Sequence, residues 1–438
     1  MGVELGNVLT IICFLGEIVE VGDRIRIRKG ENVYEGILMP SDAGREIISV
    51  KLDNGYNIGF RRRDLAVEVL EKGKPFSATM PRMEISYRDE LPDIAILGTG
   101  GTVASKIDYQ TGAVYPAFSP EELLMLVPEL SELANISGKE MLSIVSEDIR
   151  IRDWKDMASS IYDHIEGGYD GVVVTHGTDT LHYTTSMISF MLRELPVPVV
   201  FVGAQRSSDR PSSDAAFNLI SSVNFSSSDC KEVVLCMHAD MNDEFCHVHR
   251  GTRVRKFHTS RRDAFTSINS SPIARVYGGS SIEFLSDYKD ESNGDMVLDT
   301  AVEEKVGLVK TYPESREVLS CLIDKGFKGV VLEGTGLGHA PMSMRDEIDR
   351  GIEEGMFFGM TSQCIHGMVN MNVYRGGREL KEKGVVPLGD MLAETAWCKL
   401  CFALGHYDSH DELREFMLSD IAGEITDRSH VDEYNYQR

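Results

Sequence analysis

Basic residues are scarce in this sequence relative to acidic ones. It has 45 lysines and arginines against 69 aspartates and glutamates, which gives a formal net charge of −24. Such a surface repels nucleic acid, because nucleic-acid binding depends largely on neutralising phosphates. Any RNA contact must therefore be local or be made by a partner. The hydrophobic content of 42% and charged content of 26% are typical of a globular protein, and 438 residues suffice for two or three domains.

Long apolar runs are also absent, and no run approaches the roughly 18 residues of a membrane span. The run Val8–Leu15 resembles the apolar part of a signal peptide. However, Glu4 is the only charge before it, and no small-residue cleavage site follows. We therefore expect this run to be a packed helix or strand in a cytoplasmic protein without membrane contact.

The cysteines form no framework of regular spacing, and eight scattered cysteines suit a reducing cytosol. Cys398 and Cys401 form a CxxC pair within a helical pattern, but no second pair lies nearby. One cluster is dense enough to suggest metal binding, although its spacing matches no zinc pattern: Cys236, His238, Cys246, His247 and His249. We predict no metal site.

A complete nucleotide-binding loop is lacking too, although one segment comes near it. Apolar Ile94–Leu97 predicts a buried parallel strand, and the glycines after it allow a sharp turn. Lys106 is misplaced for a Walker loop, and Val103 stands where a dinucleotide fingerprint needs a third glycine or alanine. The turn instead carries Thr99 and Thr102 at the carboxyl end of the strand, where α/β sheets bind ligands. A hydroxyl among glycine amides can attack an acyl carbon, but an ordinary strand-to-loop turn is an open alternative.

Residues 21–70 differ from the rest of the chain in their pattern of apolar and polar residues. Short runs with partial or clear alternation occur at Ile25–Arg28, Ile47–Leu52 and Tyr56–Phe60. Asn54-Gly55 between the last two is a hairpin signal. The pattern predicts a small SH3-like β-barrel domain over residues 1–75, followed by a linker over residues 76–92.

From Asp93 onward, strands alternate with helices, which is typical of a mainly parallel, doubly wound α/β sheet. In the first unit, residues 93–290, the expected strands are 94–97, 171–176, 197–202 and 233–237, and the expected helices are 119–127, 153–166, 180–195 and 214–223. In the second unit, residues 300–438, the expected strands are 307–310, 329–332 and 356–361, and the expected helices are 314–325, 341–353, 389–403 and 410–421. Two doubly wound α/β domains therefore follow the small β-domain.

Three further segments carry polar residues just after apolar runs. Thr178 and Asp179 follow the run that ends at His176, and Ser146-Glu147 follows Met141–Val145. Lys256 lies one loop beyond another apolar run. A hydroxyl, a carboxylate and a lysine together form a possible charge relay that deprotonates a hydroxyl or a water. Taken singly, each has a plainer reading, namely a helix N-cap or a solvated surface charge.

Four motifs in sequence order carry a family resemblance: Thr99-Gly-Gly-Thr102, His176-Gly-Thr-Asp-Thr180, Val202-Gly-Ala-Gln-Arg206 and Phe217-Asn-Leu219. With the lysine segment, they make the chain similar to the L-asparaginase/glutaminase family of bacterial type over almost all of residues 93–425. The resemblance implies an asparaginase-like fold and hydrolysis of an amide. It also implies a homodimer core in which the second α/β unit of one copy completes the site of the other.

The resemblance also assigns roles to individual residues. Thr102 corresponds to the nucleophile, assisted by Tyr109 in a flexible loop. Thr178, Asp179 and Lys256 correspond to a second catalytic group, in which Asp179 and Lys256 tune Thr178 and the attacking water. The residues expected to bind or support the substrate are Ser146, Glu147, Thr99 and His339, with Asp179 also facing the substrate's α-amino group.

Two segments before this shared core and two within it resemble one branch of the family more closely. They are Val21–Ile27, Asn54–Gly59, Gly251–Ala264 and Glu394–Leu400. These segments are similar to the D subunits of archaeal tRNA-dependent amidotransferases, carbon–nitrogen ligases of protein biosynthesis that use glutamine as amido donor.

That resemblance implies a glutaminase subunit that forms a threonyl-acyl intermediate and supplies ammonia for the conversion of Glu-tRNA(Gln) into Gln-tRNA(Gln). A tRNA-binding E-type subunit would bind ATP and Mg²⁺ and receive the ammonia, in a two-plus-two heterotetramer. This chain itself would need no cofactor. The alternatives are a free-standing cytosolic L-asparaginase with the same catalytic residues, and an asparaginase-like scaffold without activity.

Overall fold

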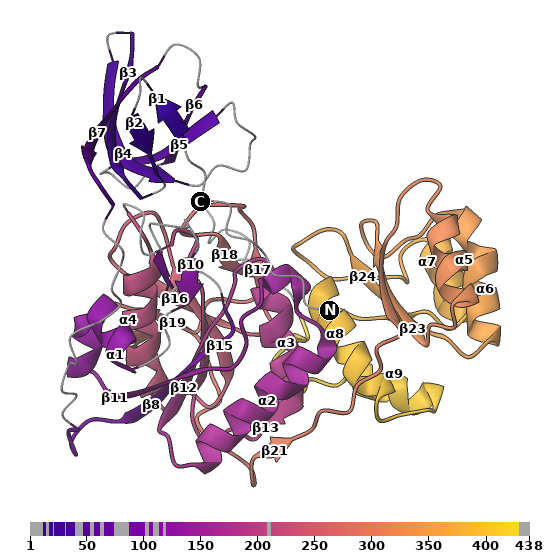
Figure 1. The fold of residues 1–438 in the computed structure, drawn as a ribbon. Helices are drawn as coiled ribbons and strands as arrows, with labels where there is room; N and C mark the ends of the chain where they lie inside the picture. Colours follow the sequence, from indigo (N-terminus) through magenta and orange to yellow (C-terminus); the bar gives the residue numbers. More distant parts are fainter. Residues whose placement is uncertain are drawn as a thin grey trace, which may run out of the picture.

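The computed structural model describes residues 12–14, 17–20, 22–30, 32–39, 47–52, 57–61, 65–73, 87–100, 105–107, 114–116, 120–207 and 212–428 (Figure 1). Thr102, Tyr109, the Asn54-Gly55 turn and most of the predicted linker lie outside these ranges, so what the sequence predicts for them stays a prediction. Within these ranges, no helix combines the length and apolar character needed to cross a membrane.

The amino-terminal region is a small antiparallel β-domain, at the top of Figure 1. Its five-stranded sheet has the order β6-β5-β4-β3-β7, with β3 Arg24–Lys29, β4 Asn32–Met39, β5 Ile47–Leu52, β6 Asn57–Arg61 and β7 Ala66–Glu71. The predicted strands are confirmed, and β5 pairs with β6 as the hairpin signal indicates. Among the described strands β6 and β7 lie at opposite edges, so closure into a barrel stays a prediction.

The alternation seen in the sequence explains the core of this β-domain. Ile25 and Ile27 are fully buried, whereas Arg26 between them pairs at the surface with Glu35 and Glu68. The described part of the Val8–Leu15 run is a short strand, β1 Ile12–Phe14, which pairs antiparallel with β2 Glu17–Val19.

The first α/β unit contains an eight-stranded sheet with the order β11-β8-β12-β14-β15-β16-β19-β20. The parallel strands are β8 Asp93–Gly98, β11 Asn135–Glu140, β12 Gly171–Thr175, β14 Val199–Val202 and β15 Val233–His238. The antiparallel strands are β16 Cys246–Arg250, β19 Ala274–Val276 and β20 Ile282–Phe284. The parallel strands predicted from apolar runs are confirmed, whereas β11 and the antiparallel part were not predicted.

Helices cover both faces of this sheet, as a doubly wound fold requires (Figure 1). Ala95 and Leu97 of β8 pack with α2 Ile151–Glu166 and α3 Leu181–Met191. Ile94 and Ile96 point the other way, toward α1 Pro120–Leu126 and α4 Ala215–Ser226. Because side chains alternate along a strand, a continuous apolar run is buried on both faces.

Two predicted helix boundaries need correction. The helix expected over 153–166 begins at Ile151, where the backbone N–H of Arg150 donates to the Asp153 carboxylate (2.8 Å). The helix expected over 180–195 ends at Met191, and its last residues form β13 Leu192–Arg193, paired with β21 Val297–Leu298. Glu194 follows in a left-handed conformation (φ 51°), which no helix continues through.

The second α/β unit has a four-stranded parallel sheet with the order β22-β23-β24-β25. Its strands are β22 Val306–Lys310, β23 Gly329–Gly334, β24 Phe357–Ser362 and β25 Val386–Pro387. Its helices are α5 Arg316–Asp324, α6 Arg345–Glu353, α7 Arg375–Glu382, α8 Ala393–Leu404 and α9 His410–Leu418. The three predicted strands and four predicted helices are present, although α6 and α8 begin at Arg345 and Ala393 rather than at 341 and 389. Helix α9 ends at Leu418 rather than at 421. Helix α7 and strand β25 were not predicted.

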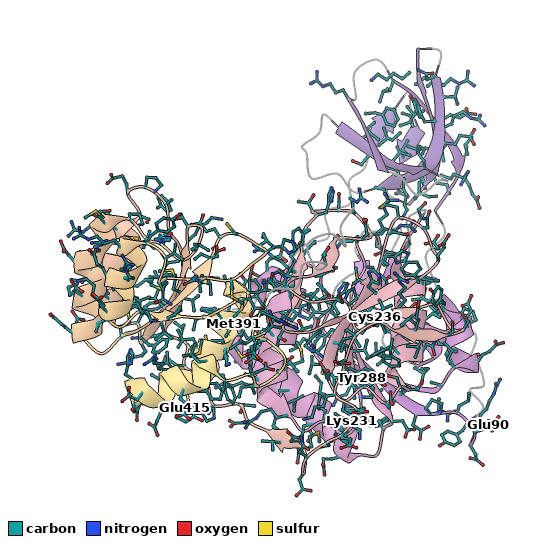
Figure 2. The ribbon with its side chains drawn as sticks, turned by 180° about the vertical axis from the view of Figure 1, so that it is seen from behind. Glu90, Lys231, Cys236, Tyr288, Met391 and Glu415 are labelled. Carbon is teal, nitrogen blue, oxygen red and sulfur yellow. The ribbon has the colours of Figure 1, made fainter. Side chains whose placement is uncertain are left out.

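Helix α8 joins the two units, because it packs against α3 of the first unit and against β22, β23 and β24 of the second. Trp397 of α8 lies edge-on to Trp154 of α2 and donates its indole N–H to the Val306 carbonyl (2.9 Å). Met391, labelled in Figure 2, lies just before α8 where the units meet. The segment that leads into α8, Met391–Ala393, lies beside Arg255 and Asn269 of the first unit.

Candidate active site

The candidate site begins where β8 and β12 end side by side. The backbone N–H and the hydroxyl of Thr99 both donate to the Thr175 carbonyl, at 3.0 and 3.1 Å. Gly100 has φ 106°, and a Cβ there would lie 2.6 Å from the Ile144 carbonyl oxygen. Only glycine fits this turn, and the Thr99 hydroxyl holds the turn to β12.

Lys256, Thr178 and Asp179 come together at this edge of the sheet. Lys256 ends β17 Val254–Lys256, which pairs with β18 Phe265–Ser267. Its Nζ donates to Thr178 Oγ1 and to Asp179 Oδ1, both at 2.8 Å. The Lys256 side chain is 10% exposed, whereas that of Asp179 is 68% exposed. The structure thus joins an almost buried ammonium to a hydroxyl and to a carboxylate that faces outward.

Ser146 and Glu147 lie beside this group. Ser146 is buried in a short 3-10 helix, Ser146–Asp148, and its carbonyl accepts the Thr180 hydroxyl at 2.6 Å. A Cβ at Gly177 would lie 2.9 Å from Ser146 Cβ, so this glycine allows the close approach. Glu147 is exposed and remains available to a ligand.

His339 lies elsewhere. It follows β23 in the second unit, where Thr335 and His339 form an isolated bridge and its ring lies edge-on to Tyr374 at 5.4 Å. No hydrogen bond or ring contact of the described residues joins His339 to Thr178, Asp179 or Lys256. The structure therefore does not place His339 in the site of its own chain.

Two buried histidines flank the Thr178 turn in sequence and were not singled out from the sequence, although His176 lies in a motif. His176 donates from Nδ1 to the Gly177 carbonyl (2.6 Å), and its Nε2 accepts the Thr184 hydroxyl (3.0 Å). Thr184 in turn accepts the Trp154 indole N–H at 2.9 Å. Burial lowers the pKa of His176 to about 4 and that of His182 to about 3. Both rings are neutral near pH 7, and that of His176 serves as a fixed support.

These two pKa values predict an acid-sensitive fold. Between about pH 6.5 and pH 4 these histidines bind protons in the unfolded chain but stay neutral in the folded chain. The free energy of unfolding is therefore highest above about pH 6.5 and decreases as the pH falls. Each histidine contributes at most about 1.4 kcal/mol per pH unit. Urea denaturation at about pH 7.5 and about pH 5 measures the slope. The variant His182→Asn should make it shallower, and equal stability at both pH values contradicts the prediction.

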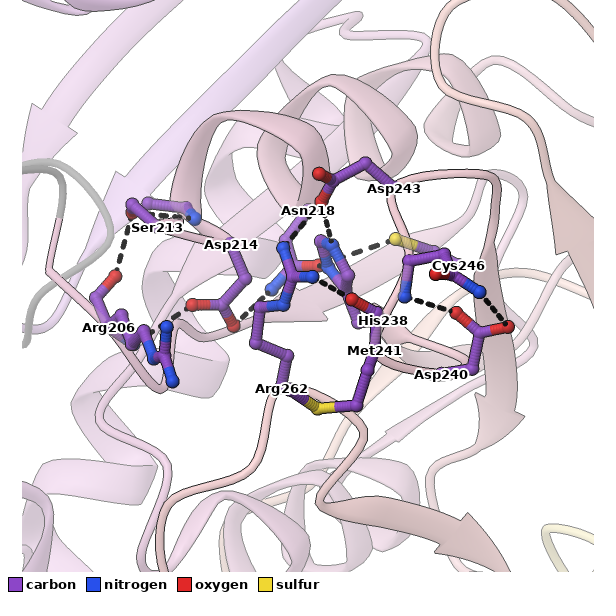
Figure 3. A network of polar contacts seen from close by, with 12 residues as sticks. Arg206, Ser213, Asp214, Asn218, His238, Asp240, Met241, Asp243, Cys246 and Arg262 are labelled. Carbon is purple, nitrogen blue, oxygen red and sulfur yellow. Dashed lines mark hydrogen bonds and ion pairs between the residues drawn. The ribbon is translucent and has the colours of Figure 1, made fainter. Parts of the chain in front are cut away.

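A polar network links two of the sequence motifs to the Lys256 hairpin (Figure 3). Asp214 accepts the backbone N–H groups of Gln205 and Arg206 and the side-chain amide of Asn218, all at 2.9–3.0 Å. Asn218 accepts from His238 Nδ1, as the dashed lines in Figure 3 show. This network fixes the loop after β14.

The network continues to the loop that follows Lys256. His238 contacts Asp243 through Nε2 at 2.9 Å, and Arg262 donates to the same carboxylate at 2.6 Å. His238 belongs to the cysteine–histidine cluster considered above as a metal site. Among the described residues no group of three histidine, cysteine or acidic side chains is arranged to hold a metal ion.

Comparison with known families agrees with this geometry. Residues 93–289 match the family model "Asparaginase, N-terminal", residues 305–417 match "Glutaminase/Asparaginase C-terminal domain", and residues 19–70 match "GatD N-terminal domain". The thermostable L-asparaginase from Thermococcus kodakarensis superposes with a TM-score of 0.70 at 33% identity, covering 76% of this chain and 99% of that one. L-asparaginase I from Vibrio cholerae gives 0.67 at 29% identity, with 77% and 99% covered. Fold and site thus define an asparaginase-like amidohydrolase.

Full-length relatives narrow the class. The D subunit of glutamyl-tRNA(Gln) amidotransferase from Pyrococcus furiosus is 52% identical over 93% of this chain and 95% of its own length. The D subunit from Pyrococcus abyssi is 50% identical over 95% and 97%, and that from Methanothermobacter thermautotrophicus is 47% identical over 94% and 95%. The chain belongs to the family of glutamyl-tRNA(Gln) amidotransferase D subunits, which confirms both resemblances seen in the sequence.

Proposed function

We propose that this chain is the glutaminase subunit of an enzyme that converts Glu-tRNA(Gln) into Gln-tRNA(Gln). The observation that carries the proposal is the contact of Lys256 Nζ with both Thr178 and Asp179, beside the Thr99 turn, in a member of this family. The partly buried lysine can exchange a proton with the Thr178 hydroxyl or with a water bound there.

The proposed reaction has two steps. The Thr102 hydroxyl, assisted by Tyr109, attacks the side-chain amide carbon of glutamine, the C–N bond breaks, and ammonia leaves with the transferred proton. Water activated at Thr178, Asp179 and Lys256 then hydrolyses the glutamyl ester, releasing glutamate and restoring the Thr102 hydroxyl. Neither step needs a metal or a nucleotide on this chain.

Substrate binding is proposed for the residues around this group. Exposed Glu147 and Asp179 suit the α-ammonium group of glutamine, while Ser146 and nearby turn amides suit its α-carboxylate. Thr99 supports the turn through its bond to Thr175. His339 is assigned to the site of a second copy, because among the described residues its printed contacts are with Thr335 and Tyr374 and not with the catalytic group of its own chain.

The proposed assembly divides the work between two kinds of subunit. Two copies of this chain form a homodimer core, and two E-type subunits bind the tRNA, ATP and Mg²⁺ and receive the ammonia, in the cytoplasm. A chain with a net charge of −24 is suited to leave most tRNA phosphate contacts to a partner.

The alternative, a free-standing L-asparaginase, is favoured by the structural likeness to such enzymes. The deciding experiment measures ammonia release from glutamine and from asparagine by this chain alone, with its partner, and with partner plus Glu-tRNA(Gln). We expect glutamine hydrolysis that rises several-fold with partner and charged tRNA. A Thr102→Ala chain in the same complex is the inactive control. Rapid asparagine hydrolysis by the isolated chain, unaffected by the partner, would favour the alternative.

A further inference from the structure

The strand that carries Lys256 has two functional faces. Side chains alternate along an extended strand, so within β17 Val254 and Lys256 point one way while Arg255 points the other, and Arg253 directly precedes the strand. Val254 is buried in the first unit and Lys256 reaches Thr178 and Asp179. Both arginines form ion pairs with the second unit.

Arg253 forms the deeper of these ion pairs. Its guanidinium NH1 donates to Asp390 Oδ2 at 2.9 Å, and its Nε donates to the Gly423 carbonyl at 2.9 Å. Both side chains of the pair are at most 1% exposed. This contact docks the second unit and the segment after α9 onto the start of β17.

Arg255 forms the second pair, immediately before Lys256. Its guanidinium lies 3.1 Å from Glu394 Oε1, in the first turn of α8. Glu394 is 5% exposed, and burial raises its pKa although Arg255 acts to lower it. A cavity of about 10 Å³, enough for one water, lies beside Arg255 and residues 389–393. A buried carboxylate held by one arginine is a strong constraint on that arginine.

We propose that Glu394 is a positioning residue for the amidase reaction. Through Arg255 it fixes the direction of β17, and thereby keeps Lys256 Nζ within hydrogen-bond distance of both Thr178 and Asp179. The inference rests on the proposed function, because it assumes that Lys256 is catalytic.

The charge of Glu394 matters as well as its position. Arg255 and Lys256 are consecutive residues of β17, and each forms an ion pair, with Glu394 at 3.1 Å and with Asp179 at 2.8 Å. A guanidinium released from Glu394 loses the one carboxylate with which it forms an ion pair among the described residues, so Arg255 no longer fixes the strand residue that precedes Lys256. The far side of the hairpin is fixed separately, through Arg262 and Asp243 (Figure 3). Loss of Glu394 therefore acts on the Lys256 end without releasing the whole hairpin.

The test uses the complete complex with Glu394→Gln, which keeps the shape of the side chain but removes its charge. We expect kcat for glutamine hydrolysis to fall roughly 10- to 100-fold, because a displacement of about 1 Å at a catalytic group can cost about 100-fold. KM should change much less than kcat, since Ser146 and Glu147 are untouched and only the contact of Asp179 with Lys256 is altered. Glu394→Asp should restore part of kcat, which a purely structural role of Glu394 does not predict.

A matched control is available within the second unit. Glu347 is 7% exposed and pairs with Arg316 at 2.9 Å and with Arg350 at 3.2 Å, so it is also a buried carboxylate held by arginine, but it lies in α6 and not in α8. Glu347→Gln should keep wild-type kcat. Wild-type kcat in Glu394→Gln, or an equal loss in Glu347→Gln, overturns the proposal.

The double variant Arg255→Gln, Glu394→Gln guards against a folding defect, because it leaves no unpaired buried charge. If the two residues act as one unit, its kcat matches that of the single variants instead of showing multiplied losses. Wild-type kcat in this double variant, or multiplied losses, overturns the inference. The variant Lys256→Met separates the catalytic role of Lys256 from the positioning role of Glu394. If Lys256→Met retains activity, the catalytic role of Lys256 is refuted. If Lys256→Met is inactive while Glu394→Gln has the wild-type kcat, only the positioning role of Glu394 is refuted.

Discussion

Replacement of Lys256 by methionine is expected to abolish glutamine hydrolysis, with kcat falling about 10²- to 10⁴-fold and the fold intact. Methionine fills a similar volume but offers no proton donor to Thr178 Oγ1 or Asp179 Oδ1, both now 2.8 Å from the ammonium. Removal of a positioned general acid or base typically costs a factor in that range. The measurement is the steady-state rate of glutamate formation by the complete complex, with circular dichroism to verify folding.

Lys289→Met is the matched control for this prediction. Lys289 also forms a lysine–carboxylate pair, with Glu194 at 2.9 Å, but Glu194 lies beyond the carboxyl end of α3 whereas Thr178 and Asp179 precede its amino end. This variant should hydrolyse glutamine at the wild-type rate. A Lys256→Met enzyme as active as the Lys289→Met enzyme refutes the role assigned to Lys256.

Replacement of Asp390 by alanine is expected to lower the free energy of unfolding by about 3–5 kcal/mol, since it leaves the Arg253 guanidinium buried without its counter-charge. Asp390 also accepts the backbone N–H of Thr426 at 3.0 Å and the hydroxyl of the same residue. One substitution thus weakens both the contact between the two units and the anchoring of the carboxyl-terminal segment. Chemical denaturation followed by tryptophan fluorescence measures the loss, because Trp154 and Trp397 lie in edge contact across this junction.

The expected loss of unfolding free energy in Asp390→Ala depends on the burial of the Arg253–Asp390 ion pair. An exposed ion pair serves as the comparison. Glu283 lies 3.4 Å from Arg275 with half of its side chain exposed, and surface pairs contribute about 0–1 kcal/mol. Glu283→Ala should therefore leave the unfolding midpoint almost unchanged. Similar losses in the two variants would show that the Arg253–Asp390 pair contributes no more than a surface contact.

The parts of the fold that were predictable are those with strong local patterns. Strands β8, β12 and β14 are short apolar runs bounded by turn signals, and this pattern is sufficient for strands buried on both faces. Helix α7 was missed because its sequence, RGGRELKE, contains two glycines and a single apolar residue, Leu380. It forms because Leu380 packs into the core of the second unit, which no local pattern reveals.

The candidate site was predictable as a set of segments but not as a geometry. The motifs around Thr99 and Thr178 each follow an apolar strand, so their place at one sheet edge follows from a parallel sheet. Ser146 follows the run Met141–Val145, which is not a strand, so its place beside them was not predictable in this way. Lys256 was assigned through the family resemblance, because a lone lysine after a loop carries no signal of its own. The contributions of His176 and Arg255 became visible only from their neighbours, the Gly177 carbonyl and Glu394.

The sequence by itself determined the alternation of strands and helices, the small β-domain, and the chemistry of the turns, because apolar periodicity and glycine-rich turns act over a few residues. Only the tertiary structure decided that Lys256 meets Thr178, 78 positions away, and that Glu394 holds the arginine beside it. The second of these contacts depends on where α8 packs, between α3 of the first unit and the sheet of the second. The position of α8 is set by the packing of many buried side chains from both units, so it cannot be predicted from any single segment of the sequence.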